Sequence, residues 1–588
     1  MQTTEWGDCG MKSPLEQKKN ASHIIIGVVV VDFNHLVGPQ IEQSYPRHLQ
    51  ENEALGSQLP FMALPDGSHM SGEDYCYFHL HCESIQHDTI FGISYNRQIM
   101  SDQLINKGSQ VTRSMVQKAV VILATQPIFG PMRAKLSMVT QAYFDQRDLN
   151  NMQILEEFYD NLESGLACAM EIQKDNHKLD ANNTLYMGTS LRELVYKWRF
   201  KVLMLMKLLL LQRRTMFFGY PVEHLCTLQY NLVSLIPALL PSLQDAAVPE
   251  LNTCSEGRSK AESLKMTDRQ SLLSYMGLPL PLFSKDAFFQ PYCPLQQMEM
   301  LSSPSWLIGT TNRIFKHQRT NCPDVVVELE SMQIQVQDPS LNSLIALTPA
   351  DRRWMDGIIQ VVQETWNHAD PGQPDQMQYE GSDDYIRARF EEYVFGLLSA
   401  AKYLHLNPHG SDVAVVQSFG GEFLDAFCQS RVFKQWNSYT DDTLCDLISH
   451  QHPFTGKTTT ITDMALRLQA GLHDLHLEEN WAPTKEALTA ALQAGSSSLS
   501  KVTSSWRQDL GRLASSSVWS SPRATFDESR EAVDGASSSP EGKIRPSALE
   551  VTRAQGTAAI SQIGSFLSTR RRTWYDALQG RSTSNQKS

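Results

Sequence analysis

Hydrophobic residues in the first third of the chain recur in short β-branched or alternating runs, a pattern that predicts strands. Such runs occupy residues 24–33, 75–80, 89–95 and 116–123. Apolar residues then follow helical spacing over 133–144 and again over 154–166. Because a sheet with flanking helices buries both kinds of apolar face, we expect an α/β unit over residues 22–165.

The middle of the chain alternates helix and strand signals. Ser190 precedes an apolar helical run, and Glu193 stands at capping-box spacing from it. This helix is expected to reach residue 211, followed by a short strand at 216–218 and a helix at 225–240. Apolar runs follow at 306–315 and 325–328, and residues 334–336 are expected to form another strand. The pattern predicts a second α/β unit over 185–340.

A polar stretch, a helical part and the N-terminus complete the description of the chain before its last segment. Residues 242–273 are rich in Asn, Ser, Glu and Lys, which indicates a solvated linker inside the second unit. Helical spacing over 350–366, 385–404 and 419–433 predicts a helical part over 345–475. Residues 1–21 have no apolar core, so we expect a disordered N-terminus rather than a signal peptide.

The last segment, 476–588, is Ser-rich and resembles a low-complexity tail with two amphipathic islands. In each island, bulky apolar residues lie on one helix face, and the opposite face is mainly Ser, Thr, Gly and Gln. This combination is typical of helices that sense lipid packing. Arg571 lies in a triple-Arg run that would attract anionic lipids. Docking on the folded part, or plain disorder, are the alternatives. The candidate membrane-contact residues are Leu499, Val502, Trp506, Ile560, Ile563, Leu567, Arg571 and Trp574.

Composition narrows the class of protein. The 588 residues are 41% hydrophobic and 20% charged, enough to bury a core, and the net charge of −13 argues against nucleic acid as the main partner. The ten cysteines form no CxxC pair, so free thiols in a reducing cytosol fit best. The most apolar run, 202–211, is about half a membrane span and contains Lys207, so we expect a buried helix.

Motifs for covalent chemistry are weak. Gly456-Lys457-Thr458 ends like a P-loop, but Gln451 stands where that loop needs Gly. His79 and His81 would share one strand face near His87, so a metal pair is possible, although surface histidines are the more ordinary interpretation. We therefore predict no catalytic residue, no cofactor, no metal and no small-molecule substrate.

Three stretches resemble a known family. SHIIIGVVVVDFNHLVGPQIEQSYP (22–46), LPFMALPDG (59–67) and LRELVYKWRFKVLMLMKLLLLQRRTMFFGYPV (191–222) are similar to the late secretory pathway (Avl-nine) family of the DENN superfamily. The resemblance covers residues 22–475. It implies a longin-like fold for the first unit and a central and a downstream DENN portion behind it.

The resemblance also implies a function. DENN proteins mostly regulate Rab GTPases, so it implies a Rab partner, promotion of GDP release, and a peripheral place on Golgi-derived, secretory or endosomal membranes. The alternative is a Rab-binding scaffold or effector without exchange activity. Two turn-forming segments are the candidates for partner contact, although turn chemistry alone explains their composition. They consist of Pro65, Asp66 and Gly67, and of Gly309, Thr311 and Asn312.

Overall fold

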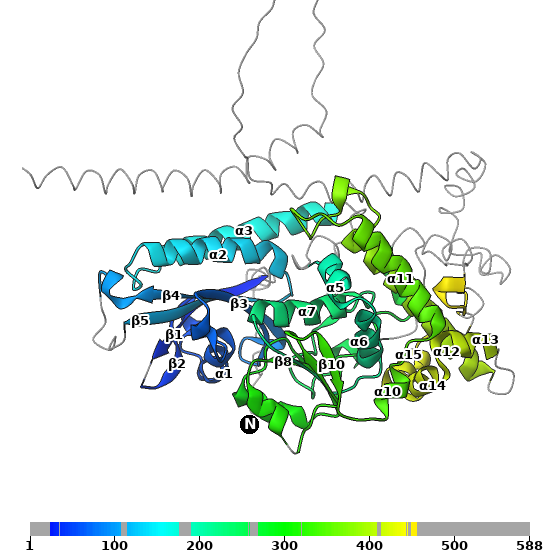
Figure 1. Ribbon diagram of the computed structural model, residues 1–588. Helices are drawn as coiled ribbons and strands as arrows, with labels where there is room; N and C mark the ends of the chain where they lie inside the picture. Colours follow the sequence, from blue (N-terminus) through cyan, green and yellow to red (C-terminus); the bar gives the residue numbers. More distant parts are fainter. Residues whose placement is uncertain are drawn as a thin grey trace, which may run out of the picture. The chain divides into compact units, whose positions relative to one another are not determined.

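The computed structural model describes residues 24–34, 36–106, 114–175, 190–256, 258, 269–318, 320–407, 413–442, 444 and 448–455. Backbone contacts divide the chain into two units, Met1–Ser516 and Ser517–Ser588, and every described residue belongs to the first. The described residues form two five-stranded sheets with many helices (Figure 1), which confirms the predicted mixed α/β class.

The first sheet is antiparallel, with the strand order β2-β1-β5-β4-β3. Strands β1 and β5 contain continuous runs of mainly β-branched residues, because both of their faces are covered. Helices α2 and α3 lie along one side of the sheet and α1 along the other (Figure 1). The strands are β1 (Ile25–Asn34), β2 (Gly38–Tyr45), β3 (Glu73–Cys82), β4 (Gln86–Met100) and β5 (Met115–Ala124), and the helices are α1 (Glu53–Ala63), α2 (Phe129–Asp145) and α3 (Gln153–Asp175).

The second sheet is mostly parallel, with the order β10-β9-β6-β8-β7. Strand β6 runs parallel to β8 and β9, β7 runs parallel to β8, and β10 pairs antiparallel with β9. Helix α7 (Val222–Ser234) packs on β6 and β8. The strands are β6 (Thr215–Phe218), β7 (Ala287–Gln290), β8 (Ser305–Thr310), β9 (Val325–Glu328) and β10 (Gln333–Val336).

The helix expected over 191–211 is two helices. Ser190 caps α5 (Leu191–Trp198) by accepting a hydrogen bond from the Glu193 backbone N–H, as the sequence predicts. Arg199 then adopts a φ of 47°, which ends the helix, and α6 (Lys201–Leu210) begins in a new direction. The side chains of α6 are largely buried, and no helix among the described residues combines the length and apolarity that a membrane crossing requires.

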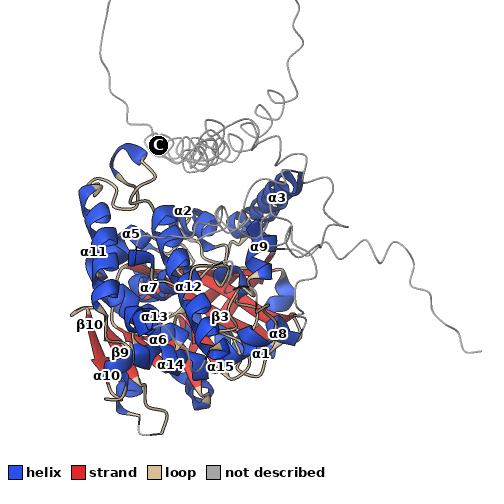
Figure 2. Cartoon of the chain, turned by 90° about the vertical axis from the view of Figure 1, so that its right-hand side faces the viewer, coloured by secondary structure: helices blue, strands red, loops and turns tan. Residues whose placement is uncertain are grey.

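The third part is helical. Figure 2 shows α12 to α15 side by side, and Thr348 and Asp351 form a capping box at the start of α11. The helix expected over 419–433 is interrupted twice, by Gly420 with a φ of 92° and by Ser430, which caps α15. The helices are α10 (Leu341–Leu344), α11 (Pro349–Glu364), α12 (Asp383–Leu406), α13 (Val413–Phe419), α14 (Gly421–Gln429) and α15 (Arg431–Ser438).

The structure corrects the solvated linker expected at 242–273. Leu243, Asp245 and Ala246 are fully buried. The Gln244 carbonyl accepts hydrogen bonds from the N–H and the hydroxyl of Thr89 in β4, and the Ala246 carbonyl accepts one from the Phe289 N–H in β7. This stretch therefore lies between the two sheets. Helices α8 (Thr253–Glu256) and α9 (Arg269–Tyr275) follow. Residues 259–268 lie outside the described part of the chain.

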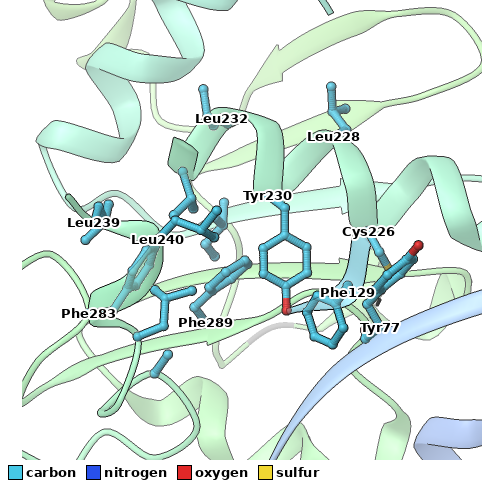
Figure 3. Packing of buried hydrophobic residues seen from close by; sticks show 14 of the residues in the cluster. Tyr77, Phe129, Cys226, Leu228, Tyr230, Leu232, Leu239, Leu240, Phe283 and Phe289 are labelled. Atoms are coloured by element: carbon cyan, nitrogen blue, oxygen red, sulfur yellow. Dashed lines mark hydrogen bonds between the residues drawn. The ribbon is translucent and has the colours of Figure 1, made fainter. Parts of the chain in front are cut away.

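Aromatic side chains join the two sheets into one core (Figure 3). Tyr77 of β3 and Phe129 of α2 meet Tyr230 of α7, with ring centroids 6.2 and 5.5 Å away from that of Tyr230. Tyr230 in turn contacts Phe289 of β7 at 5.4 Å. Such aromatic pairs add about 0.5–1.5 kcal/mol each beyond area burial. The two sheets therefore hold a fixed relation to each other.

Candidate functional site

The first candidate segment, Pro65-Asp66-Gly67, follows α1 and forms a tight turn. The Ser68 N–H donates to the Pro65 carbonyl at 3.0 Å, and Gly67 has a φ of 86°. The sequence predicts this turn correctly. Residues 59–63, which come before the turn, belong to α1, and Asn52 caps that helix by accepting from the Leu55 N–H.

The second candidate segment follows β8. Asn312 caps the short 3-10 helix η7 (Arg313–His317), since its side-chain oxygen accepts from the Ile314 N–H at 3.0 Å. Its own N–H donates to the Thr310 hydroxyl at 3.2 Å. These two interactions fix the orientation of the Asn312 carboxamide at the end of the second sheet.

The two segments, about 245 residues apart in sequence, meet at Asp66. The Thr311 hydroxyl donates to the Asp66 carbonyl at 2.9 Å, and Asn312 Nδ2 donates to the Asp66 carboxylate at 2.7 Å. Tyr220 also donates to that carbonyl, at 3.0 Å, while the Asp66 N–H donates to the Tyr292 hydroxyl at 2.7 Å. We call this set, Asp66, Tyr220, Tyr292, Thr311 and Asn312, the Asp66 junction.

Both candidate glycines are needed for close approach. A Cβ on Gly67 would lie 2.3 Å from the Tyr220 hydroxyl, and one on Gly309 would lie 2.1 Å from the Pro291 carbonyl. Gly309 is buried, so its role is to let β8 pass close to the backbone of Pro291. Pro65 is buried as well, whereas Asp66 is exposed. Of the six candidates, Asp66 and Asn312 therefore offer polar groups at the surface.

Exposed apolar side chains flank the junction. Met70 follows Asp66 by four residues and is 76% exposed, and Ile314 follows Asn312 by two residues and is 53% exposed. Sequence reasoning missed both, because exposure cannot be read from residue type. It also missed Tyr220 and Tyr292, because their hydrogen bonds with Asp66 join residues far apart in the sequence. The GYP sequence around Tyr220 was the available signal, since it ends β6 with a sharp turn. A surface on which polar groups already hydrogen-bond to one another, next to exposed apolar residues, is suited to contact with another protein.

Further interactions stiffen the region behind the junction. The Asp74 carboxylate of β3 accepts from the backbone N–H groups of Val222 and Glu223, and so caps α7 from the other sheet. Burial raises the pKa of Asp74 above its usual value, against the opposing effect of those two hydrogen bonds. Arg133 of α2 forms an ion pair with Glu223 at 2.5 Å. The junction is therefore part of a broad contact between the sheets.

His79 is not the surface residue that the sequence suggests. Its side chain is fully buried between the sheets, with Nδ1 2.7 Å from the Phe289 carbonyl and Nε2 2.8 Å from the Tyr230 hydroxyl. A carbonyl only accepts, so Nδ1 carries the proton and Nε2 accepts from Tyr230. Burial lowers the pKa of His79 to about 3. With both ring nitrogens engaged, His79 cannot pair with His81 around a metal.

The tail residues proposed for membrane contact, from Leu499 to Trp574, and the Gly456-Lys457-Thr458 sequence lie outside the described residues.

Residues 25–401 match the family described as Transport protein Avl9. The chain is 36% identical over 489 residues to the late secretory pathway protein AVL9 of Saccharomyces cerevisiae, covering 77% of this chain and 63% of that protein. It is 35% identical over 450 residues to the late secretory pathway protein avl9 of Schizosaccharomyces pombe, covering 74% of this chain and 91% of that protein. The match thus spans less than two thirds of the budding-yeast relative.

Proposed function

Because the chain belongs to the Avl9 family of transport proteins, we propose that it serves vesicle traffic in the late secretory pathway by binding a Rab GTPase and promoting GDP release. The family that the residue pattern indicates is confirmed. The names of both relatives support a trafficking role. To this trafficking role the proposal adds a Rab partner and an exchange activity.

The observation that carries the proposal is the Asp66 junction. It joins a loop of the first sheet to the end of β8 in the second sheet, next to exposed Met70 and Ile314. We further propose that the first sheet with α1, α2 and α3 is the longin-like lobe, and that the GTPase contacts both lobes at this junction. A surface shared by two rigid lobes can favour one conformation of a bound GTPase over another.

The proposed exchange needs no covalent step. A factor that binds the nucleotide-free GTPase more tightly than the GDP-bound form must, by linkage, weaken GDP binding by the same ratio. What this chain supplies is a preorganised surface, because the hydrogen bonds around Asp66 and the Asp74 cap hold the two lobes in place. Such preorganisation reduces the ordering cost of binding.

The test is binding to a panel of purified Rabs, each nucleotide-free and GDP-loaded, together with the rate of GDP release. Met70→Asp and Ile314→Asp are expected to weaken binding by about tenfold or more, as charged substitutions at an interface anchor do. Met377→Asp is the matched control, since Met377 is 70% exposed but lies in the helical part. Equal affinity for both Rab forms would remove exchange and leave the scaffold or effector alternative.

We also propose that the tail holds the protein on the cytoplasmic side of Golgi-derived, secretory or endosomal membranes without crossing them. This rests on the amphipathic pattern of residues 499–506 and 560–574. Membrane attachment would raise the local concentration of a membrane-bound GTPase around the Asp66 junction.

A further inference from the structure

The turn between β3 and β4 brings three side chains of metal-binding type together. His81 stands near the end of β3, Glu83 lies in the turn and His87 is the second residue of β4. One ligand atom from each lies within 4.8 Å of the other two. His87 Nδ1 is 3.6 Å from the Glu83 carboxylate. The group comes from both sides of one hairpin.

The backbone of this hairpin is held in place by its own hydrogen bonds. The Ile85 N–H donates to the Cys82 carbonyl at 2.9 Å, and Cys82 pairs with Gln86 across the ladder after a shift in register beyond Leu80. Asn52, the cap of α1, donates to the Ser84 hydroxyl at 2.8 Å and ties the turn to the helix. Ligands on such a fixed frame need little ordering when an ion binds.

His81 has a ring nitrogen without a protein partner. Its Nε2 is shielded from solvent and makes no hydrogen bond to any of the described residues. An unsatisfied buried polar atom costs about 1–3 kcal/mol, and an ion is one of the groups that can satisfy it. His79, two residues earlier, differs because both of its ring nitrogens are engaged.

We propose that His81, Glu83 and His87 form a Zn²⁺ site. Two imidazoles and one carboxylate are a donor set that Zn²⁺ accepts at about 2.0–2.2 Å, with the fourth tetrahedral position taken by water. Ligand atoms at such distances lie roughly 3.4 Å apart, so separations that are now within 4.8 Å must close by at most about 1.4 Å. Rotation of the exposed Glu83 and His87 side chains provides this movement.

The site is independent of the proposed Rab function. It lies at the β3–β4 turn, whereas the Asp66 junction involves the turn after α1 and the end of β8. The sequence-based interpretation considered His79 and His81 as a pair, and the structure replaces His79 with Glu83 and His87. Zinc would join both strands of the hairpin through their side chains and stabilise its end.

The experiment uses the untagged full chain, stripped of metal, in competition with a chromophoric zinc chelator. We expect one equivalent of tightly held Zn²⁺. Glu83→Gln and His87→Gln should each weaken it by about 100-fold, since loss of a ligand costs at least as much as loss of an outer-shell partner. Both side chains are exposed, so these variants should fold normally. His69→Gln is the control, because His69 is exposed and outside the hairpin.

A second readout separates the site from surface adsorption. Co²⁺ in place of Zn²⁺ should give the visible absorption of a low-coordinate site in the wild-type chain and in His69→Gln, but not in His87→Gln. Absence of a stoichiometric Zn²⁺ equivalent in the wild-type chain would overturn the proposal. So would equal zinc affinity of Glu83→Gln, His87→Gln and the wild-type chain, or loss of the site in His69→Gln.

Discussion

The Gln290 side chain pairs with both backbone groups of His79. Its Oε1 accepts from the His79 N–H at 2.7 Å, and its Nε2 donates to the His79 carbonyl at 2.8 Å. The carboxamide thus takes the place of a peptide group in a neighbouring strand. Strand β3 is the edge of the first sheet and β7 the edge of the second. A buried side chain therefore satisfies an unpaired sheet edge and fixes the position of one sheet against the other.

The first prediction concerns the acid sensitivity that His79 introduces. Its pKa of about 3 in the folded chain lies below the unfolded value near 6.5, so between these values the unfolded state binds more protons. The free energy of unfolding should therefore fall as pH falls through 6.5. Between pH 7.5 and 5.5 the His79 contribution is about 1.4 kcal/mol. Urea unfolding at the two pH values measures it.

His79→Phe tests the assignment. The Phe ring keeps the contacts with Phe91 and Phe289 but cannot hydrogen-bond, so the variant should be less stable at pH 7.5 and show a smaller loss on acidification. His69→Gln, at an exposed position, should keep the wild-type difference between the two pH values. An unchanged pH dependence in His79→Phe would show that other groups cause the acid effect.

The second prediction concerns the buried ion pair of Lys207 and Asp351. The Lys207 ammonium lies 2.6 Å from the Asp351 carboxylate, and both side chains are fully buried. Burial alone would raise the pKa of Asp351, but the hydrogen bond from His452 and the charge of Lys207 lower it. Lys207→Met should reduce the free energy of unfolding by about 3–5 kcal/mol, because it leaves a buried carboxylate with one cation fewer.

Lys197→Met is the matched control for this pair. Lys197 contacts Glu193 at 2.8 Å, but both side chains are 40% or more exposed, so the change should stay within about 1 kcal/mol. The double variant Lys207→Met with Asp351→Leu should recover part of the loss, since it removes both charges. Thermal unfolding of the four proteins distinguishes these cases. A loss in Lys197→Met equal to that in Lys207→Met would contradict the role assigned to burial.

The third prediction separates two glycines. Gly309→Ala should destabilise the fold by about 3 kcal/mol, because its Cβ would lie 2.1 Å from the backbone oxygen of Pro291, which cannot rotate away. Gly357→Ala should stabilise it by about 0.5–1 kcal/mol, since Gly357 is an exposed residue of α11 with open space around its Cβ position. Denaturant midpoints measure the stability of both variants. If Gly309→Ala were as stable as the wild-type chain, the predicted clash with the Pro291 carbonyl would be disproved.

The fourth prediction concerns the tail, and it rests on sequence alone. The full chain should float with small anionic vesicles whose lipids pack poorly, and Trp574→Ala together with Ile560→Ala should lower the bound fraction. The control is Leu36→Ala with Met377→Ala, which removes exposed apolar side chains outside the tail. Equal flotation of both double variants would favour docking on protein over contact with lipid.

The sequence by itself determined the local elements. Period-two and helical patterns located β1, β5, α2 and α11, because these patterns record which face of an element is buried. Turn chemistry identified Pro65-Asp66-Gly67, since only Gly adopts the required φ without strain. Such signals act within a few residues and need no knowledge of the rest of the chain.

Tertiary structure alone decided where those elements meet. The polar stretch after Ser242 is buried because Thr89 and Phe289 bond its carbonyls, and His79 is buried because Gln290 and Tyr230 supply partners. Asp66 reaches Asn312 across 246 residues of sequence. No local pattern encodes such contacts, because the free energy of burying a polar group depends on distant partners that only the folded chain brings near.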